Sequence, residues 1–99
     1  MNLLQETKNI IKFFGKFQKD VEWVGTQHVF MSWGSFKKWA DVDYDNSFGG
    51  EVINPDLLVV GEDWWLERHE YDGSEWWEYK EKPEKPLHKQ TLPPIKEDL

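Results

Sequence analysis

Two tryptophan-rich segments flank Asp72-Gly73, and this pattern constrains the fold more than any other part of the chain. Four of the seven tryptophans lie in these segments, Trp64–Tyr71 and Ser74–Tyr79. Asp-Gly is typical of a two-residue type I′ turn, because both central residues of that turn need positive φ. The sequence therefore predicts a β-hairpin in which residue 71 faces residue 74 and residue 67 faces residue 78.

This register divides the hairpin side chains between two faces, because successive residues of a strand point in opposite directions. We assign one face to the core, with Arg68 opposite Trp77 as a cation–π pair. That face carries Trp64, Leu66, Arg68, Glu70, Glu75, Trp77, Tyr79 and Glu81. The other face leaves Trp65 and Trp76 partly exposed, unless the sheet is sandwiched between two helices.

A three-residue loop with a G1 bulge is an alternative around the same Asp-Gly pair. It shifts the pairing by one residue, so that Arg68 opposes Trp76 and Glu67 opposes Trp77. The faces of one strand would then flip relative to the other, and the sequence leaves both registers open.

Two helices are expected before the hairpin. Apolar residues at helical spacing indicate a helix over residues 3–14, with Asn2 as its N-cap. A second helix, capped by Ser32 or Ser35, is expected to end near Asp41. The side chains that it would direct toward the core are Phe36, Trp39 and Ala40.

The remaining elements predict a small α+β domain with an antiparallel β-meander or sheet of about five strands, in which the last three strands form a meander. Strands are expected at residues 21–24, 29–31, 57–60, 64–71 and 75–80. A fourteen-residue loop at 43–56 is long for a connection without structure, and such loops are often functional. The compact domain would span residues 1–81, and the charged, proline-rich residues 82–99 would form a disordered tail.

The net charge of −7 is concentrated in the middle of the chain. Residues 1–40 carry +3, residues 41–81 carry −11 and residues 82–99 carry +1. The acidic segment repels phosphates and attracts cations or basic protein surfaces, so nucleic acid is not an expected partner. The alternative interpretation is a solvated face that keeps an aromatic-rich protein in solution.

The sequence carries no pattern typical of an enzyme or of a cofactor-binding protein. It has no nucleophile motif, phosphate-binding loop, dinucleotide fingerprint or zinc-protease motif. The absence of cysteine excludes disulfides and thiolate metal sites. With no secretory signal and no apolar run long enough for a membrane span, we expect a soluble, cytoplasmic, non-enzymatic protein without a membrane partner.

Two clusters leave a divalent-metal or small-ligand module as an alternative function. The first opens like an EF-hand loop but has Val52 where a bidentate Glu is required, with Glu51 one residue too early. It consists of Asp41, Asp43 and Asp45. The second arises because the two-residue turn places two carboxylates opposite each other beside an imidazole. It consists of Glu67, His69 and Glu78.

Four segments of the chain resemble small uncharacterised proteins encoded by phages and prophages of lactococci and streptococci. They are Trp23-Val24-Gly25, Phe36–Asp41, Leu58–Gly61 and, most specifically, Trp64–Glu78. The resemblance covers roughly residues 1–82. It implies a bacterial cytoplasm and an accessory phage gene, and it transfers no activity and no functional residue.

These observations together predict an α+β module that binds a host or phage protein with a basic surface. Trp65 and Trp76 would be the anchors, because aromatic residues dominate interface energies. The side chains that would steer the partner are Glu67, Glu70, Asp72, Glu75 and Glu78. A sharper version is counter-defence, in which the acidic segment mimics DNA phosphates and occupies a host nuclease. Self-association through the exposed tryptophan face is a further alternative.

Overall fold

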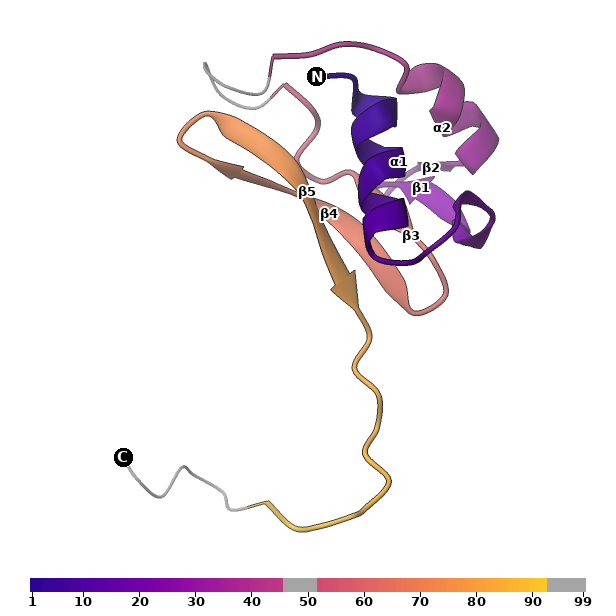
Figure 1. The fold of residues 1–99 in the computed structure, drawn as a ribbon, viewed down its shortest axis with the longest axis vertical. Helices are drawn as coiled ribbons and strands as arrows, with labels where there is room; N and C mark the ends of the chain where they lie inside the picture. The colour runs from indigo at the N-terminus through magenta and orange to yellow at the C-terminus, as the bar shows by residue number, and fades with distance from the viewer. Residues whose placement is uncertain (46–51, 93–99) are drawn as a thin grey trace.

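In the computed structural model, two helices lie against a five-stranded antiparallel sheet (Figure 1). The structure describes residues 1–45 and 52–92. The elements are α1 (Leu3–Phe13), the short 3₁₀ helix η1 (Gln18–Asp20), β1 (Trp23–Gly25), β2 (Phe30–Met31), α2 (Trp33–Trp39), β3 (Leu58–Val60), β4 (Trp64–Tyr71) and β5 (Ser74–Glu81). The strand order is β2-β1-β3-β4-β5, which confirms the predicted α+β class.

The β4–β5 hairpin has the register of the two-residue turn. Asp72 and Gly73 have φ angles of 52° and 83°, as a type I′ turn requires. Residue pairing runs from Tyr71↔Ser74 at the turn to Trp64↔Glu81 at the open end. The alternative three-residue loop is wrong, because Asp72 adopts the left-handed conformation and no extra residue is needed to reverse the chain.

Helix α1 begins and ends as its sequence predicts, to within one residue. The Asn2 side chain accepts a hydrogen bond from the Gln5 backbone N–H at 2.9 Å, which satisfies a free donor of the first turn. Leu3, Thr7 and Ile11, spaced four residues apart, form its buried stripe. The helix stops at Phe13, and Gly15 follows with a φ of 73°.

Helix α2 differs from expectation at one core position. Ser32 is its N-cap, because the Ser32 hydroxyl accepts from the Ser35 N–H at 3.1 Å. Phe36 and Ala40 are fully buried as predicted, but Trp39 is 49% exposed. The prediction for Trp39 is wrong because this residue lies at the margin of the buried stripe. The Trp39 ring contacts the Phe36 ring, with 5.9 Å between the centroids, and about half of the residue is exposed to solvent.

Strand β1 starts later than the expected residue 21. Residues 18–20 instead form η1, in which the Asp20 carboxylate accepts from the Phe17 N–H at 2.9 Å. The Val21 N–H donates to Gln18 O at 3.2 Å, so pairing with β3 begins only at the Glu22 N–H, which donates to Val60 O at 2.8 Å. The local hydrogen bonds of η1 favour a turn before residue 21, and β1 is therefore shorter than the apolar–polar alternation predicted.

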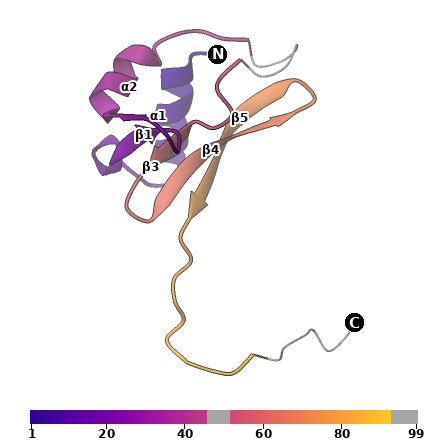
Figure 2. The same ribbon diagram turned by 180° about the vertical axis from the view of Figure 1, so that it is seen from behind.

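Both helices cover the same face of the sheet. Cross-strand pairing places Val24, Val59 and Leu66 side by side in one row. These residues form a single core with Leu3 and Ile11 of α1, and with Phe36 and Ala40 of α2. The sandwich alternative is therefore wrong. In Figures 1 and 2 the helices are grouped together, and the hairpin extends past them.

The described part of the predicted 43–56 loop contributes to the core without forming a helix or a named strand. Tyr44 and Ile53 are 7% and 8% exposed, and Asp43 forms an isolated bridge with Asn2. Residues 46–51 of this loop lie outside the described residues.

After β5, residues 82–92 carry no helix or strand and are exposed, while the rest of the predicted tail, residues 93–99, lies outside the described residues. No helix within the described ranges is long and apolar enough to cross a membrane.

Gly61 is required by the ring of Trp64. A Cβ atom on Gly61 would lie 2.2 Å from the Trp64 indole nitrogen, whereas a Cβ on Gly34 of α2 would meet nothing closer than 3.8 Å. We expect Gly61→Ala to lower the free energy of unfolding by about 1–3 kcal/mol through overpacking. The control Gly34→Ala should be neutral or stabilise by up to about 1 kcal/mol. Urea denaturation followed by tryptophan fluorescence measures both, and equal effects would contradict this account.

Candidate functional site

The sheet face opposite the helices is the candidate site. We call it the open face, because no helix of the described residues covers it. Cross-strand pairing brings together residues from all five strands, namely Trp23, Phe30, Leu58, Val60, Trp65, Glu67, His69, Trp76, Glu78 and Lys80. Phe30 is 77% exposed and Trp76 is 36% exposed, while Trp65 is half-buried. The open face therefore presents aromatic rings beside a charged row.

A chain of polar contacts runs across the open face along the hairpin. Trp65 Nε1 donates to Glu67 Oε1 at 3.0 Å. His69 Nε2 lies 3.1 Å from Glu67 Oε2, and His69 Nδ1 lies 3.2 Å from Glu78 Oε2. Lys80 Nζ lies 3.7 Å from the other oxygen of Glu78. In this charged row, each of Glu67, His69, Glu78 and Lys80 therefore has a polar or ionic contact with a neighbouring side chain.

His69 lies between Glu67 and Glu78, for which the sequence predicts repulsion because the two residues are directly opposed across the hairpin. Both ring nitrogens face a carboxylate oxygen, and both contacts are hydrogen bonds when each nitrogen carries a proton. The hydrogen bond from Trp65, together with that from His69, holds the pKa of Glu67 below its usual value. The three side chains therefore form a polar cluster in which the imidazole lies between the two carboxylates.

Two hollows adjoin the open face. The larger, of about 380 Å³, lies at the β1–β2 turn. It is lined by Glu22, Trp23, Thr26, Gln27, His28, Val29 and Phe30. The smaller, of about 290 Å³, is lined by Gln27, Pro55, Asp56, Leu58, Glu67 and Arg68. Either hollow could accept a protruding side chain of a second molecule on this side of the sheet.

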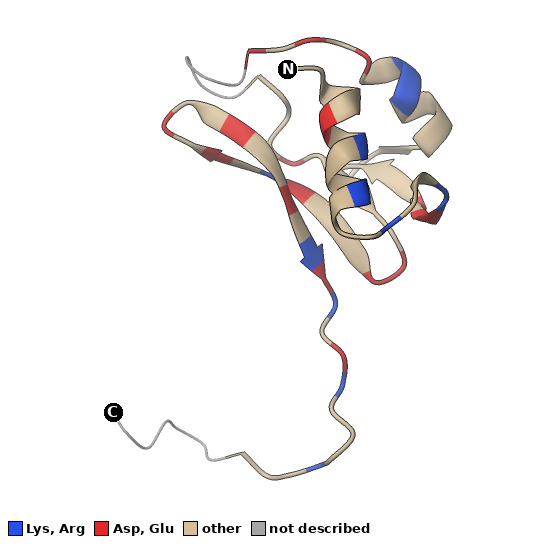
Figure 3. Ribbon diagram, in the orientation of Figure 1, with Lys and Arg blue, Asp and Glu red and all other residues tan. Residues whose placement is uncertain are grey.

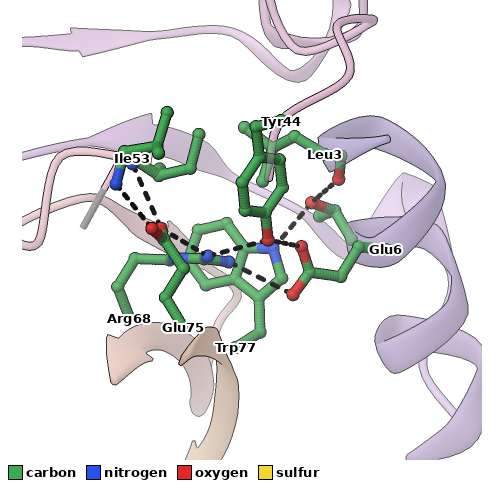
Figure 4. Close-up of polar contacts among 9 residues, drawn as sticks. Leu3, Glu6, Tyr44, Ile53, Arg68, Glu75 and Trp77 are labelled. Carbon is green, nitrogen blue, oxygen red and sulfur yellow. Dashed lines mark hydrogen bonds and ion pairs between the residues drawn. The ribbon is translucent and has the colours of Figure 1, made fainter. Parts of the chain in front are cut away.

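The opposite face of the same hairpin holds a buried ionic network centred on Arg68 (Figure 4). Arg68 Nη2 donates to Glu75 Oε1 at 2.9 Å and to the Tyr44 hydroxyl at 3.0 Å, and Nη1 donates to Glu6 Oε2 at 3.3 Å. The guanidinium carbon lies 4.7 Å from the Trp77 ring centroid, so the predicted cation–π pair is confirmed. The side chains of Arg68 and Glu75 are each 1% exposed.

Glu75 does not lie on the surface that was expected to contact a partner. Its carboxylate accepts hydrogen bonds from the backbone N–H groups of Val52 and Ile53 as well as from Arg68. Its predicted steering role is wrong for this reason, since a carboxylate buried in the core cannot meet a partner's surface. Strand alternation correctly placed Glu75 on the core face. The steering role was inferred from the negative charge of Glu75, and that inference was wrong.

Burial and hydrogen bonding shift the pKa values of two members of the network, Tyr44 and Arg68. Burial, reinforced by the hydrogen bond to Glu6, raises the pKa of Tyr44 to about 12, so its hydroxyl stays protonated. Burial opposes the charged form of Arg68, but hydrogen bonds with Tyr44 and Glu75 and the charge of Glu6 raise its pKa overall. The network thus contains one cation between two carboxylates, bridged by a neutral phenol.

The structure divides the other predicted contact residues between two places. Trp65, Trp76, Glu67 and Glu78 lie together on the open face, as the alternation indicates. Glu70 and Asp72 lie at the exposed hairpin tip, where Glu70 Oε2 accepts from the Gly73 N–H at 3.2 Å. Sequence reasoning missed the residues that β1 to β3 add to the open face, of which Phe30 is the most exposed. Their alternation in short strands was the available signal.

Neither candidate metal cluster forms a metal-binding group within the described residues, where no three His, Asp or Glu side chains are placed to hold an ion. Asp41 accepts from the Asn2 side-chain amide at 3.0 Å, and His69 lies between the carboxylates of its cluster. Residues 46–51 of the possible calcium loop lie outside the described residues.

Comparison of the chain with protein-family models, with curated proteins and with solved structures found no match.

Loss of the Arg68 side chain should be far more costly than loss of a surface cation. Arg68→Ala leaves Glu75 buried without its counter-charge, and we expect a loss of about 3–5 kcal/mol in the free energy of unfolding. Lys80→Ala, which removes the exposed contact with Glu78, should cost less than about 1 kcal/mol. Equilibrium denaturation in urea compares the two variants. A small effect of Arg68→Ala would mean that the network is not a stabilising element.

Tyr44 should make the fold sensitive to alkaline pH. Because its pKa in the folded state is about 12, against 10.0 for a free tyrosine, the folded protein holds this proton more tightly than the unfolded chain. Stability is therefore fully present below pH 10 and declines as pH rises from about 10 toward 12. Tyr79, whose pKa is also raised to about 12, adds to the decline.

The variant Tyr44→Phe should lose the part of the alkaline decline in stability that is caused by ionisation of Tyr44. The measurement is the urea midpoint of each protein at a series of pH values between 9 and 11. The slope for Tyr44→Phe should be shallower than for the wild type, although its stability at neutral pH is lower because Arg68 loses a hydrogen-bond acceptor. Identical slopes would assign the alkaline transition to other groups.

Proposed function

We propose that this chain is a non-enzymatic protein-binding module whose contact surface is the open face. One observation carries the proposal: both helices lie on one side of the sheet, and aromatic side chains occupy the other side. Phe30 on β2 and Trp76 on β5 are exposed on that side, and Trp65 on β4 is half-buried there. Exposed aromatic side chains bordered by polar residues are typical of protein interfaces.

The chemistry of the open face and its surroundings favours a partner that is both apolar and basic. Figure 3 shows acidic residues along the hairpin and in the connections, and basic residues on the helices. The acids Asp72 at the hairpin tip, Glu22 just before β1 and Glu62 in the β3–β4 connection are exposed. A basic rim on the partner would be attracted to these groups while apolar side chains contact the rings.

The buried network supports a structural role for the other face of the hairpin, and not a catalytic one. Arg68, Glu6, Tyr44 and Glu75 bond one another in the interior, where a substrate has no access to them. The carboxylates of the open face, Glu67 and Glu78, are engaged with His69. We therefore propose a function based on binding alone.

Resemblance to phage and prophage proteins makes a host or phage protein the class of partner that we propose. The DNA-mimic version of this hypothesis receives less support. It requires a row of free anions, yet Glu75 is buried against Arg68, and Glu67 and Glu78 flank His69. The open face instead offers rings with a partly neutralised charged row.

The open face can be tested by affinity capture from bacterial lysate, followed by binding measurements with the purified partner. Trp65→Ala/Trp76→Ala removes both proposed anchors, and the matched control Trp39→Ala removes an exposed ring of α2. Circular dichroism and thermal melts first establish that both variants are folded. We expect the double variant to lose roughly 30-fold or more in affinity, because an anchor residue contributes on the order of 2 kcal/mol. The control should bind like the wild type.

Equal loss in both variants, or no loss in either, would place the contact elsewhere. The salt dependence of binding adds a second readout. Attraction by exposed acids predicts weaker association at high ionic strength, because screening acts on solvent-exposed charges. Aromatic contacts predict that binding to the open face persists at moderate salt, whereas a DNA mimic would lose most of its affinity.

A further inference from the structure

Among the described residues, no strand lies beside the outer edge of β5. β5 is the last strand of the sheet, and it is eight residues long without a proline. Within the ranges that the structure describes, no hydrogen bond links the outward backbone groups of β5 to another segment. The Lys82 N–H, just after β5, donates to Asp63 O at 2.7 Å and so points toward the β4 side. A long unpaired edge of this kind is a template for another strand.

The hairpin register identifies the backbone groups at this edge. Tyr71 and Ser74 flank the two-residue turn and form a hydrogen-bonded pair, so bonded and non-bonded pairs alternate from there. The N–H and C=O groups of Trp77, Tyr79 and Glu81 belong to non-bonded pairs and therefore point away from β4. These groups are the ones that a partner strand would bond.

An apolar patch lies beside this edge on the helix side of the sheet. The Phe14 ring stacks on the Tyr79 ring, with 4.1 Å between the centroids and 5° between the planes. Phe13 packs edge-on against Phe14 and is 81% exposed, and Phe14 itself is 43% exposed. Any strand that pairs with β5 near Tyr79 would run past these rings.

We propose that two copies of this chain associate through antiparallel pairing of their β5 edges, with Tyr79 opposite Tyr79 of the second copy. In this register Glu78 of each copy faces Lys80 of the other on the open-face side, giving two complementary charge pairs. On the helix side the two Tyr79 rings meet, flanked by Phe14 of each copy. The backbone groups of Trp77 and Glu81 complete the ladder.

Other registers lack this complementarity. A two-fold axis at Glu78 would place the two Glu78 side chains opposite each other, and an axis at Lys80 would do the same for the lysines. An axis at Trp77 leaves Lys80 opposite Ser74 and brings the second strand toward Glu75, whose carboxylate holds residues 52 and 53. Pro83 has no N–H and ends the ladder beyond the charge pairs.

This dimer would join the two sheets edge to edge and leave both open faces accessible. It is independent of the proposed function, which concerns the face of the sheet and not its edge. A self-association through the open face would instead require Trp65, whose ring lies away from the β5 edge on β4. The two modes therefore predict different responses to substitution.

Sedimentation velocity over a range of micromolar concentrations tests the proposal. We expect a wild-type dimer that Lys80→Glu weakens roughly tenfold or more, because two attractive pairs become two repulsive ones. The double variant Glu78→Lys/Lys80→Glu restores opposite charges across the axis and should recover the dimer. Trp65→Ala should leave it intact. Thermal melts establish that each variant is folded.

Glu81→Pro provides a test that does not depend on charge. It removes an outward N–H from the dimer ladder and is compatible with an edge strand of the monomer, since that N–H faces solvent there. We expect this variant to be monomeric. A wild type that stays monomeric throughout, a dimer unaffected by both Lys80→Glu and Glu81→Pro, or a dimer abolished by Trp65→Ala would each overturn the proposal.

Discussion

The burial of the Arg68 guanidinium is the constraint on which the rest of the structure depends. A buried cation is tolerated only when carboxylates and hydrogen-bond acceptors surround it. Here those groups come from three separate parts of the chain: Glu6 from α1, Tyr44 from the segment after α2, and Glu75 from β5. The charge of one side chain thus ties the first helix, the long connection and the hairpin to one arrangement.

The same network separates the two faces of the hairpin. Its inner face is committed to holding the fold: Trp77 stacks on Arg68 and donates to Thr7 Oγ1 at 2.8 Å, and Glu75 holds the backbone of Val52 and Ile53. Within the part of the chain that the structure describes, its outer face has no such internal partner beyond the contacts within the charged row. A rigid hairpin with one face fully used in this way can present the other to a second molecule at little conformational cost.

Much of the candidate site follows from local rules. In the two-residue register of the Asp72-Gly73 turn, strict alternation along each strand places Trp65, Glu67, Trp76 and Glu78 on one face. The error at Glu75 has a physical origin, because exposure was inferred from its charge although its position in the strand pointed inward. Charged residues are usually exposed, but a paired carboxylate beside an arginine is the exception that only three-dimensional proximity reveals.

The sequence by itself determined the α+β class, the two helices and the hairpin around Asp72-Gly73, because each depends on hydrogen bonds and side-chain alternation among near neighbours. It left two registers of the hairpin open, and the left-handed conformation of Asp72 decided between them. Only the tertiary structure decided that both helices share one face, that Trp39 stays outside the core, and that Tyr44 and Ile53 enter it. Those outcomes depend on contacts between residues far apart in the chain, such as Arg68 with Glu6, whose pairing no local pattern specifies.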